Sequence, residues 1–191
     1  MKQLTAEQIQ MNWEELIAII NKYISFDERK DRLLTMYDDF KERMMFAPAS
    51  AKADFHNAMP GGYVEHILHI ISFSLELKQI WANNGANINF TDEELVFAVP
   101  DRGLWLLQHY GVHVTDKEYI GIKLTDGLYD DANKAYLMSY NPDYNLRSNM
   151  AYILHQADMM ATHIEYDEWK RGGEEKVINN KVPKSTDEQK Q

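Results

Sequence analysis

Residues 55–70, FHNAMPGGYVEHILHI, decide the fold, because they join a sharp turn to the most apolar helix of the chain. The proline and two glycines at 60–62 break regular structure, so a helix is expected to begin directly after them. From there to Trp81 the residues are apolar nearly all round, which is typical of a helix buried at the centre of a fold. We therefore expect a central helix over residues 62–82.

Histidines inside and just before this helix are the first candidates for a functional site. His66 faces the apolar side of the helix, whereas His69 lies at the border with a narrow polar strip. An inward histidine is either a satisfied core residue or a ligand, and the spacing leaves both open. His56, in the loop 48–60, is likewise either a solvated loop residue or a contact for a ligand.

Composition limits the classes of function. The chain has 191 residues, enough for one domain with or without tails, and a formal net charge of −10 without a Lys/Arg cluster. This charge argues against a nucleic-acid backbone as the main partner, but it leaves nucleotides open because a metal ion can neutralise their charge. With no cysteine in the sequence, a metal would be held by histidines and carboxylates, and a cytoplasmic setting fits.

The remaining pattern predicts helices only. Helix-capping sequences begin at Thr5, Thr91 and Thr115, and a last long helix is expected over 147–169. No apolar run is long enough to span a membrane, and no convincing strand is found. We predict an all-α fold in one domain over residues 1–173. Residues 174–191 are polar without periodicity and are predicted to be a disordered tail.

Two of these segments resemble a known family. The Pro-Gly-Gly-x-x-x-His pattern at 60–66 resembles the first metal-ligand motif of HD-domain metal-dependent phosphohydrolases, and residues 155–161, HQADMMA, are similar to the helix with their last ligand. The resemblance covers roughly residues 46–169. It implies an HD-like helical bundle in which His66 and Asp158 approach each other across the helices 62–82 and 147–170. It also implies that they bind a divalent metal ion: Mn, Co, Ni, Fe, Zn or Mg.

The sequence departs from this family at one place. The family's His-Asp dyad, which supplies two further ligands, is absent, and no His-Asp dipeptide occurs in the chain. Where the dyad is expected, the apolar helix after Thr91 runs into Pro100, and a proline within a helix costs roughly 3 kcal/mol. Either the chain is a natural or engineered deletion variant, or the sequence omits a segment of the natural protein.

The missing dyad weakens the expected chemistry. Two protein ligands hold a metal weakly, so the chain as written is expected to hydrolyse phosphoesters slowly or not at all. His56, His69 and Asp126 are the substitutes that the sequence offers as further ligands.

A second candidate segment, residues 123–136, is rich in polar side chains. Many HD proteins place ligand-binding residues between the dyad and the last ligand, and the resemblance therefore implies contacts with a nucleotide or a second metal here. The candidates are Asp126, Tyr129, Asp130, Asp131 and Lys134. The alternative is a turn rich in capping carboxylates.

Two functions from different classes remain. The first is an HD-type metal-dependent phosphohydrolase that acts on a nucleotide or related phosphoester and is impaired because the dyad is absent. The second is a non-catalytic helical module for binding or assembly on a degenerate HD scaffold. The sequence leaves open the substrate, the metal and whether the chain forms a homo-oligomer.

Overall fold

The computed structural model describes residues 3–52, 55–99, 103–125, 127, 131–138 and 148–170. Within these ranges all regular structure is helical and no strand occurs, which confirms the all-α class. The helices are α1 (Ala6–Tyr23), α2 (Asp27–Asp39), α3 (Lys41–Met45), α4 (Gly62–Asn83), α5 (Asp92–Ala98), α6 (Leu104–His109), α7 (Asp116–Lys123), α8 (Asp131–Leu137) and α9 (Met150–Lys170). The predicted tail, 174–191, lies outside the described residues, and the single-domain interpretation stays a prediction.

Three helices begin with a capping box, as the sequence predicts. At α1, α5 and α7 a threonine side chain accepts a hydrogen bond from the backbone N–H three residues later, and the side chain of that later residue accepts one from the threonine N–H. The caps are Thr5, Thr91 and Thr115. These reciprocal bonds satisfy donors that the first helical turn leaves open.

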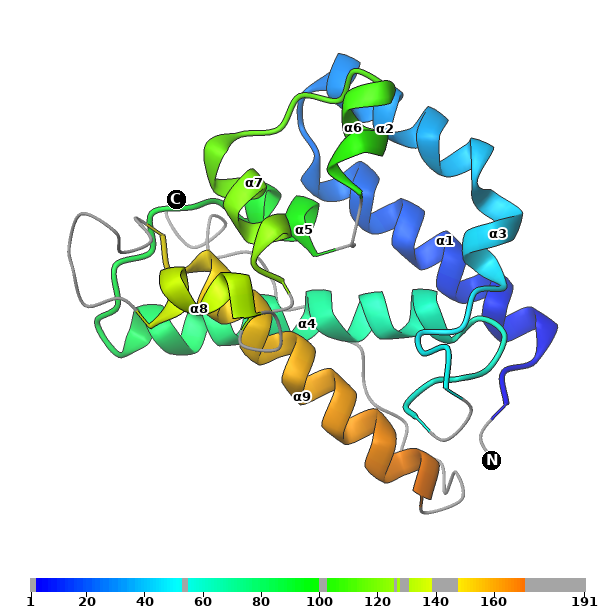
Figure 1. Ribbon diagram of the computed structural model, residues 1–191. Coiled ribbons are helices and arrows are strands. Elements are labelled where there is room, and N and C mark those ends of the chain that lie inside the picture. The colour runs from blue at the N-terminus through cyan, green and yellow to red at the C-terminus, as the bar shows by residue number, and fades with distance from the viewer. Residues whose placement is uncertain are drawn as a thin grey trace, which may run out of the picture.

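The α4 helix lies at the centre of the described fold. It packs against α9 more extensively than any other pair of helices packs, and it also contacts α1, α3 and α5. In Figure 1, α4 runs through the middle of the molecule and α9 crosses it obliquely, while α1, α2 and α3 lie together on one side. The prediction that a central helix packs against the last long helix is confirmed.

The chain after α1 differs from the expected pattern in one respect. The apolar residues between Asp27 and Met45 recur at helical spacing and predict one second helix, but the structure divides this segment into α2 and α3 at Phe40, whose backbone φ and ψ are −105° and 6°. The helix α5 stops at Ala98, in agreement with the expected termination before Pro100. None of the helices in the described part of the chain is long and apolar enough to cross a membrane.

Candidate functional site

The turn before α4 holds the loop of His56 close to the helix. Gly61 has φ +84°, in the left-handed region that favours glycine. A Cβ at Gly62 would lie 2.0 Å from the backbone oxygen of Asn57, so only glycine allows this close approach. The Asn57 side-chain amide donates to Glu65 Oε2 at 3.0 Å, and the backbone carbonyl of Asn57 accepts from Ala49 N–H at 3.0 Å. The residue beside His56 is therefore fixed against the first turn of α4.

His66 lies between two carboxylates of α9. Its Nε2 is 3.2 Å from Asp158 Oδ1, and its Nδ1 is 3.0 Å from Glu165 Oε2. The expected approach of His66 to Asp158 across the two helices is confirmed. Because both carboxylates only accept hydrogen bonds when ionised, His66 satisfies both as the doubly protonated imidazolium.

His69 supports Glu165 from the next turn of α4. Its Nδ1 donates to Glu165 Oε1 at 2.6 Å, so both carboxylate oxygens of Glu165 are engaged by histidines. The sequence places His69 at the edge of a polar strip. The structure corrects this position, since His69 is only 6% exposed. The reason is that α9 places the carboxylate of Glu165 against the His69 imidazole.

His56 completes the group from the loop side. Its ring centroid is 4.9 Å from that of His66, and its Nδ1 is buried with no hydrogen-bond partner among the described residues. One ligand atom each from His56, His66 and Glu165 lie within 4.8 Å of one another. We call His56, His66, His69, Asp158 and Glu165 the α4–α9 cluster.

Charge in the α4–α9 cluster shifts three pKa values. Burial lowers the pKa of His66, but the hydrogen bonds and negative charges of Asp158 and Glu165 outweigh burial and raise it from 6.5 to about 9. Burial raises the pKa of Glu165, but hydrogen bonds and charge from His66 and His69 lower it on balance. Burial, together with the positive charge of His66, lowers the pKa of His56. At neutral pH His66, between α4 and α9, is therefore protonated, and the imidazole of His56 beside it is neutral.

The donor atoms fit a divalent transition metal. Two imidazoles and a carboxylate suit Mn, Co, Ni, Fe or Zn better than Mg, which prefers oxygen ligands. The buried Nδ1 of His56 has no other described partner, and an atom of this kind requires an explanation. Metal binding would displace the proton of His66, because only a neutral imidazole nitrogen can be a ligand. The geometry thus provides more candidate donors than the pair His66 and Asp158.

Of the other predicted substrate-binding residues, Asp131 and Lys134 are those that the structure describes, and neither joins this group. Lys134 lies on α8 and is exposed, and its Nζ is 2.5 Å from Asp131 Oδ1. Among the described residues, the hydrogen bonds of the α4–α9 cluster do not include Lys134. This ion pair within the first turn of α8 favours the interpretation of a turn rich in capping carboxylates over that of a nucleotide contact. Asp126, Tyr129 and Asp130 lie outside the described residues.

Glu165 is the residue that the sequence reasoning missed. It lies two turns after Asp158 on the same face of α9, so the spacing places both carboxylates toward α4. Glu165 is 1% exposed, and a fully buried carboxylate needs a charged or hydrogen-bonding partner. The spacing of seven residues from Asp158 is the pattern that could have revealed it.

A comparison with protein-family models, curated proteins and solved structures finds no match to this chain.

Proposed function

We propose that this chain binds a divalent metal ion between α4 and α9 and acts as a metal-dependent phosphohydrolase of the HD type on a nucleotide or related phosphoester. The observation that carries the proposal is the convergence of ligand atoms from His56, His66 and Glu165 within 4.8 Å. The resemblance of residues 60–66 and 155–161 to the family's ligand motifs supports the same reaction class.

The proposed ligand set departs from the family pattern. His66 and Asp158 match family ligands position by position, whereas His56 and Glu165 stand in for the absent dyad. The proposed site therefore has four candidate protein ligands, where the sequence alone predicts two. His69 is then a positioning residue, because its Nδ1 donates to Glu165 at 2.6 Å and fixes the direction of that carboxylate.

A divalent ion held here would polarise a phosphoryl oxygen and lower the pKa of a bound water. The protein's own part is to hold and move protons. The His66 imidazolium donates its Nδ1–H to Glu165 and its Nε2–H to Asp158, and it would release one of these two protons on becoming a ligand. Asp158 is the most accessible carboxylate of the α4–α9 cluster, with 24% of its side chain exposed.

A non-catalytic module is the second candidate, and one observation favours it. Both ring nitrogens of His66 and both oxygens of Glu165 already have hydrogen-bond partners within the protein. A closed network of this kind can fix the packing of α4 on α9 without an ion or a reaction. The two candidates therefore differ in whether an ion displaces the proton of His66.

Metal titration followed by an activity assay tests the proposal. The chain is titrated calorimetrically with Mn²⁺, Co²⁺, Ni²⁺, Zn²⁺ and Mg²⁺, and phosphate release from nucleoside mono- and triphosphates is measured before and after chelation. We expect binding of about one ion and slow, chelator-sensitive release. Both are lost in Glu165→Gln and in His56→Ala. The matched control is Glu76→Gln, which removes an exposed carboxylate from α4.

Each outcome has a defined meaning. Metal binding without release from any phosphoester supports the non-catalytic module. No metal binding by the intact chain overturns the metal centre. Release that survives both chelation and the two cluster variants would place the reaction elsewhere in the protein.

The proposed setting follows from composition. A small phosphoester or nucleotide is the partner, rather than a nucleic-acid backbone, because the net charge is −10 without a basic cluster. A chain without cysteine also suits the cytoplasm, where we place the reaction.

A further inference from the structure

A pocket away from the α4–α9 cluster has apolar walls and one cation. Its volume is about 400 Å³, within the range of small-molecule sites. Its apolar lining is drawn from the end of α2, from α3, from the segment after α3, from the start of α4 and from α6. These residues are Met36, Phe40, Met44, Ala47, Tyr63 and Leu106. Arg43 is the one charged side chain among the described residues that line it. We call this the Arg43 pocket.

The walls of the Arg43 pocket are held by contacts that do not depend on a ligand. Tyr63 N–H donates to the Ala47 carbonyl at 3.0 Å, which joins the segment after α3 to the start of α4. The rings of Phe40 and Tyr110 meet edge to face with centroids 6.4 Å apart. Tyr110 also donates its hydroxyl to Asp39 Oδ2 at 2.6 Å, which ties the end of α6 to α2. A pocket fixed in this way binds with little ordering cost.

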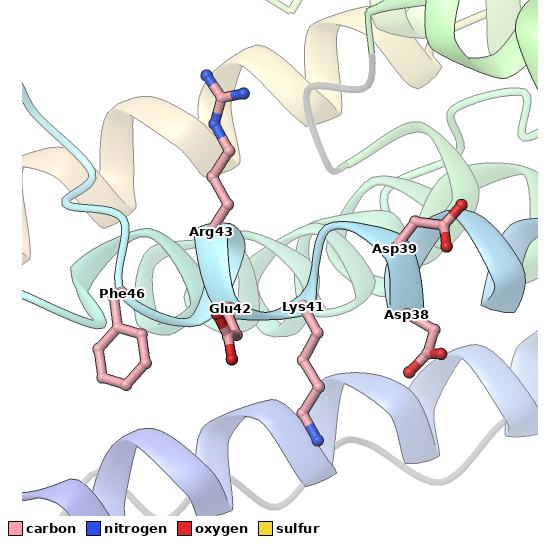
Figure 2. Close-up of a pocket in the computed structure, with 6 residues that line it drawn as sticks. All are labelled: Asp38, Asp39, Lys41, Glu42, Arg43 and Phe46. Carbon is pink, nitrogen blue, oxygen red and sulfur yellow. The ribbon is translucent and has the colours of Figure 1, made fainter.

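Arg43 is available to a ligand. Within the described part of the chain it makes no hydrogen bond or ion pair, although the protein carries ten more acidic than basic side chains. Figure 2 shows its side chain leaving α3 on the side opposite to Lys41, Glu42 and Phe46. The guanidinium therefore points away from the adjacent acidic residue of its own helix.

From this arrangement we infer that the Arg43 pocket binds a small molecule with a flat apolar body and one anionic group: a carboxylate, sulfonate or phosphate. Phe40, Tyr63 and the aliphatic walls cover the apolar body. Arg43 pairs with the anion through its fork of N–H donors. Met36 and Met44 are unbranched and adapt to ligands of different outline. This inference is independent of the proposed hydrolase function.

Two dyes that share a ring system test the inference. Anilinonaphthalene sulfonate carries the anion, and phenylnaphthylamine has the same rings without it. Fluorescence titration of the folded chain should show one saturable site for the sulfonate. Arg43→Gln should weaken sulfonate binding several-fold, up to about fivefold, because Arg43 is exposed and a solvent-screened ion pair contributes up to about 1 kcal/mol. Binding of phenylnaphthylamine should stay within twofold.

Matched variants separate this pocket from general surface effects. Lys41→Gln removes a cation from the same short helix but does not line the Arg43 pocket, so it should leave both dyes unaffected. Leu106→Trp should fill the pocket and weaken both dyes. Glu165→Gln should change neither, because it alters the α4–α9 cluster. Near-ultraviolet circular dichroism checks that each variant retains native packing.

Several results would overturn the inference. Equal weakening by Arg43→Gln and Lys41→Gln would show non-specific attraction to surface charge. Sulfonate binding that survives Leu106→Trp in a folded protein would place the dye elsewhere. Dye fluorescence that rises only as near-ultraviolet dichroism is lost would show binding to unfolded chains, not to the Arg43 pocket.

Discussion

Two buried glutamates, Glu118 on α7 and Glu165 on α9, show two ways to keep a carboxylate inside this fold. Glu118 is 0% exposed and Glu165 is 1% exposed. Glu118 accepts from Arg29 Nη2 at 2.6 Å and from the Thr115 backbone N–H at 2.7 Å. The Arg29 guanidinium also lies 3.9 Å from the centre of the Phe97 ring. Glu165 instead has two histidines as partners.

The two partners differ in whether they can lose their charge. Arginine stays protonated at any pH a protein survives, so the Arg29–Glu118 pair is a fixed structural contact. Histidine can release its proton, as His66 does when the pH rises through its pKa of about 9, or when a metal takes the proton's place. The difference teaches that burial of a carboxylate does not by itself mark a functional site. The chemistry of the partner does.

Breaking the fixed pair should have the largest effect. Arg29→Met leaves Glu118 buried without a counter-charge, which should lower the free energy of unfolding by about 3–5 kcal/mol. Urea denaturation at pH 7 measures this. The double variant Arg29→Met/Glu118→Leu should regain part of the loss, because neither charge then remains buried, although the Thr115 N–H loses its acceptor. Arg32→Met, which removes an exposed pair with Glu28, should cost less than about 1 kcal/mol.

The second largest effect should be a difference in how the contacts of the two glutamates change stability with pH. The pKa of His66 is raised from 6.5 to about 9, so its contribution is complete below pH 6.5 and is lost as the pH rises through 9. The gap in unfolding free energy between wild type and His66→Gln should therefore shrink by about 3 kcal/mol between pH 6 and pH 10. Denaturant titrations across this range measure it. The gap between wild type and Arg29→Met should stay constant, and an equal drift of both would contradict the comparison.

Metal addition should stabilise through the histidine-paired glutamate alone. At a free concentration one hundred times the Kd, Mn²⁺ should raise the unfolding free energy by about 2.7 kcal/mol. Chelation should reverse the increase, and Glu165→Gln should abolish it. Thermal unfolding with and without the ion provides the measurement. The Glu118→Gln variant should retain the full metal effect, and a loss there would mean that the ion does not act at the α4–α9 cluster.

The smallest effect should come from the cap beside Glu118. Thr115→Ala removes the side-chain acceptor at the start of α7 but leaves the Arg29–Glu118 pair in place, so the expected cost is about 1 kcal/mol. Urea denaturation measures it. A cost approaching that of Arg29→Met would show that the pair depends on the cap for its position.

Part of the α4–α9 cluster can be predicted from the sequence, and the rest cannot, for physical reasons. Helical periodicity turns His66 inward, and the resemblance to HD-domain phosphohydrolases implies its approach to Asp158, which the 3.2 Å contact confirms. Glu165 is harder to recognise, because a carboxylate near the end of a helix is usually solvated, and its partner His69 looks like a border residue. The position of His56 depends on a loop path that no periodicity describes.

The helices likewise fall into those that local sequence patterns predict and those that they do not. Capping patterns and apolar repeats predict helices α1, α4, α5, α7 and α9, because these signals are local to each helix. The break at Phe40 between α2 and α3 carries no proline or glycine, so local rules extend the helix through it. The two ion-paired glutamates are a tertiary property, since each partner comes from a helix distant in the chain.

The contact between the His56 loop and the first turn of α4 also has a consequence for the order of folding. His56 and His66 are close in sequence, so the short loop between them closes at little entropic cost. Glu165 lies 99 residues from His66, and such distant contacts form late. We therefore expect the histidine pair to come together before the Glu165 carboxylate reaches it. The rate at which metal affinity appears during refolding would therefore report the rate at which α9 packs onto α4.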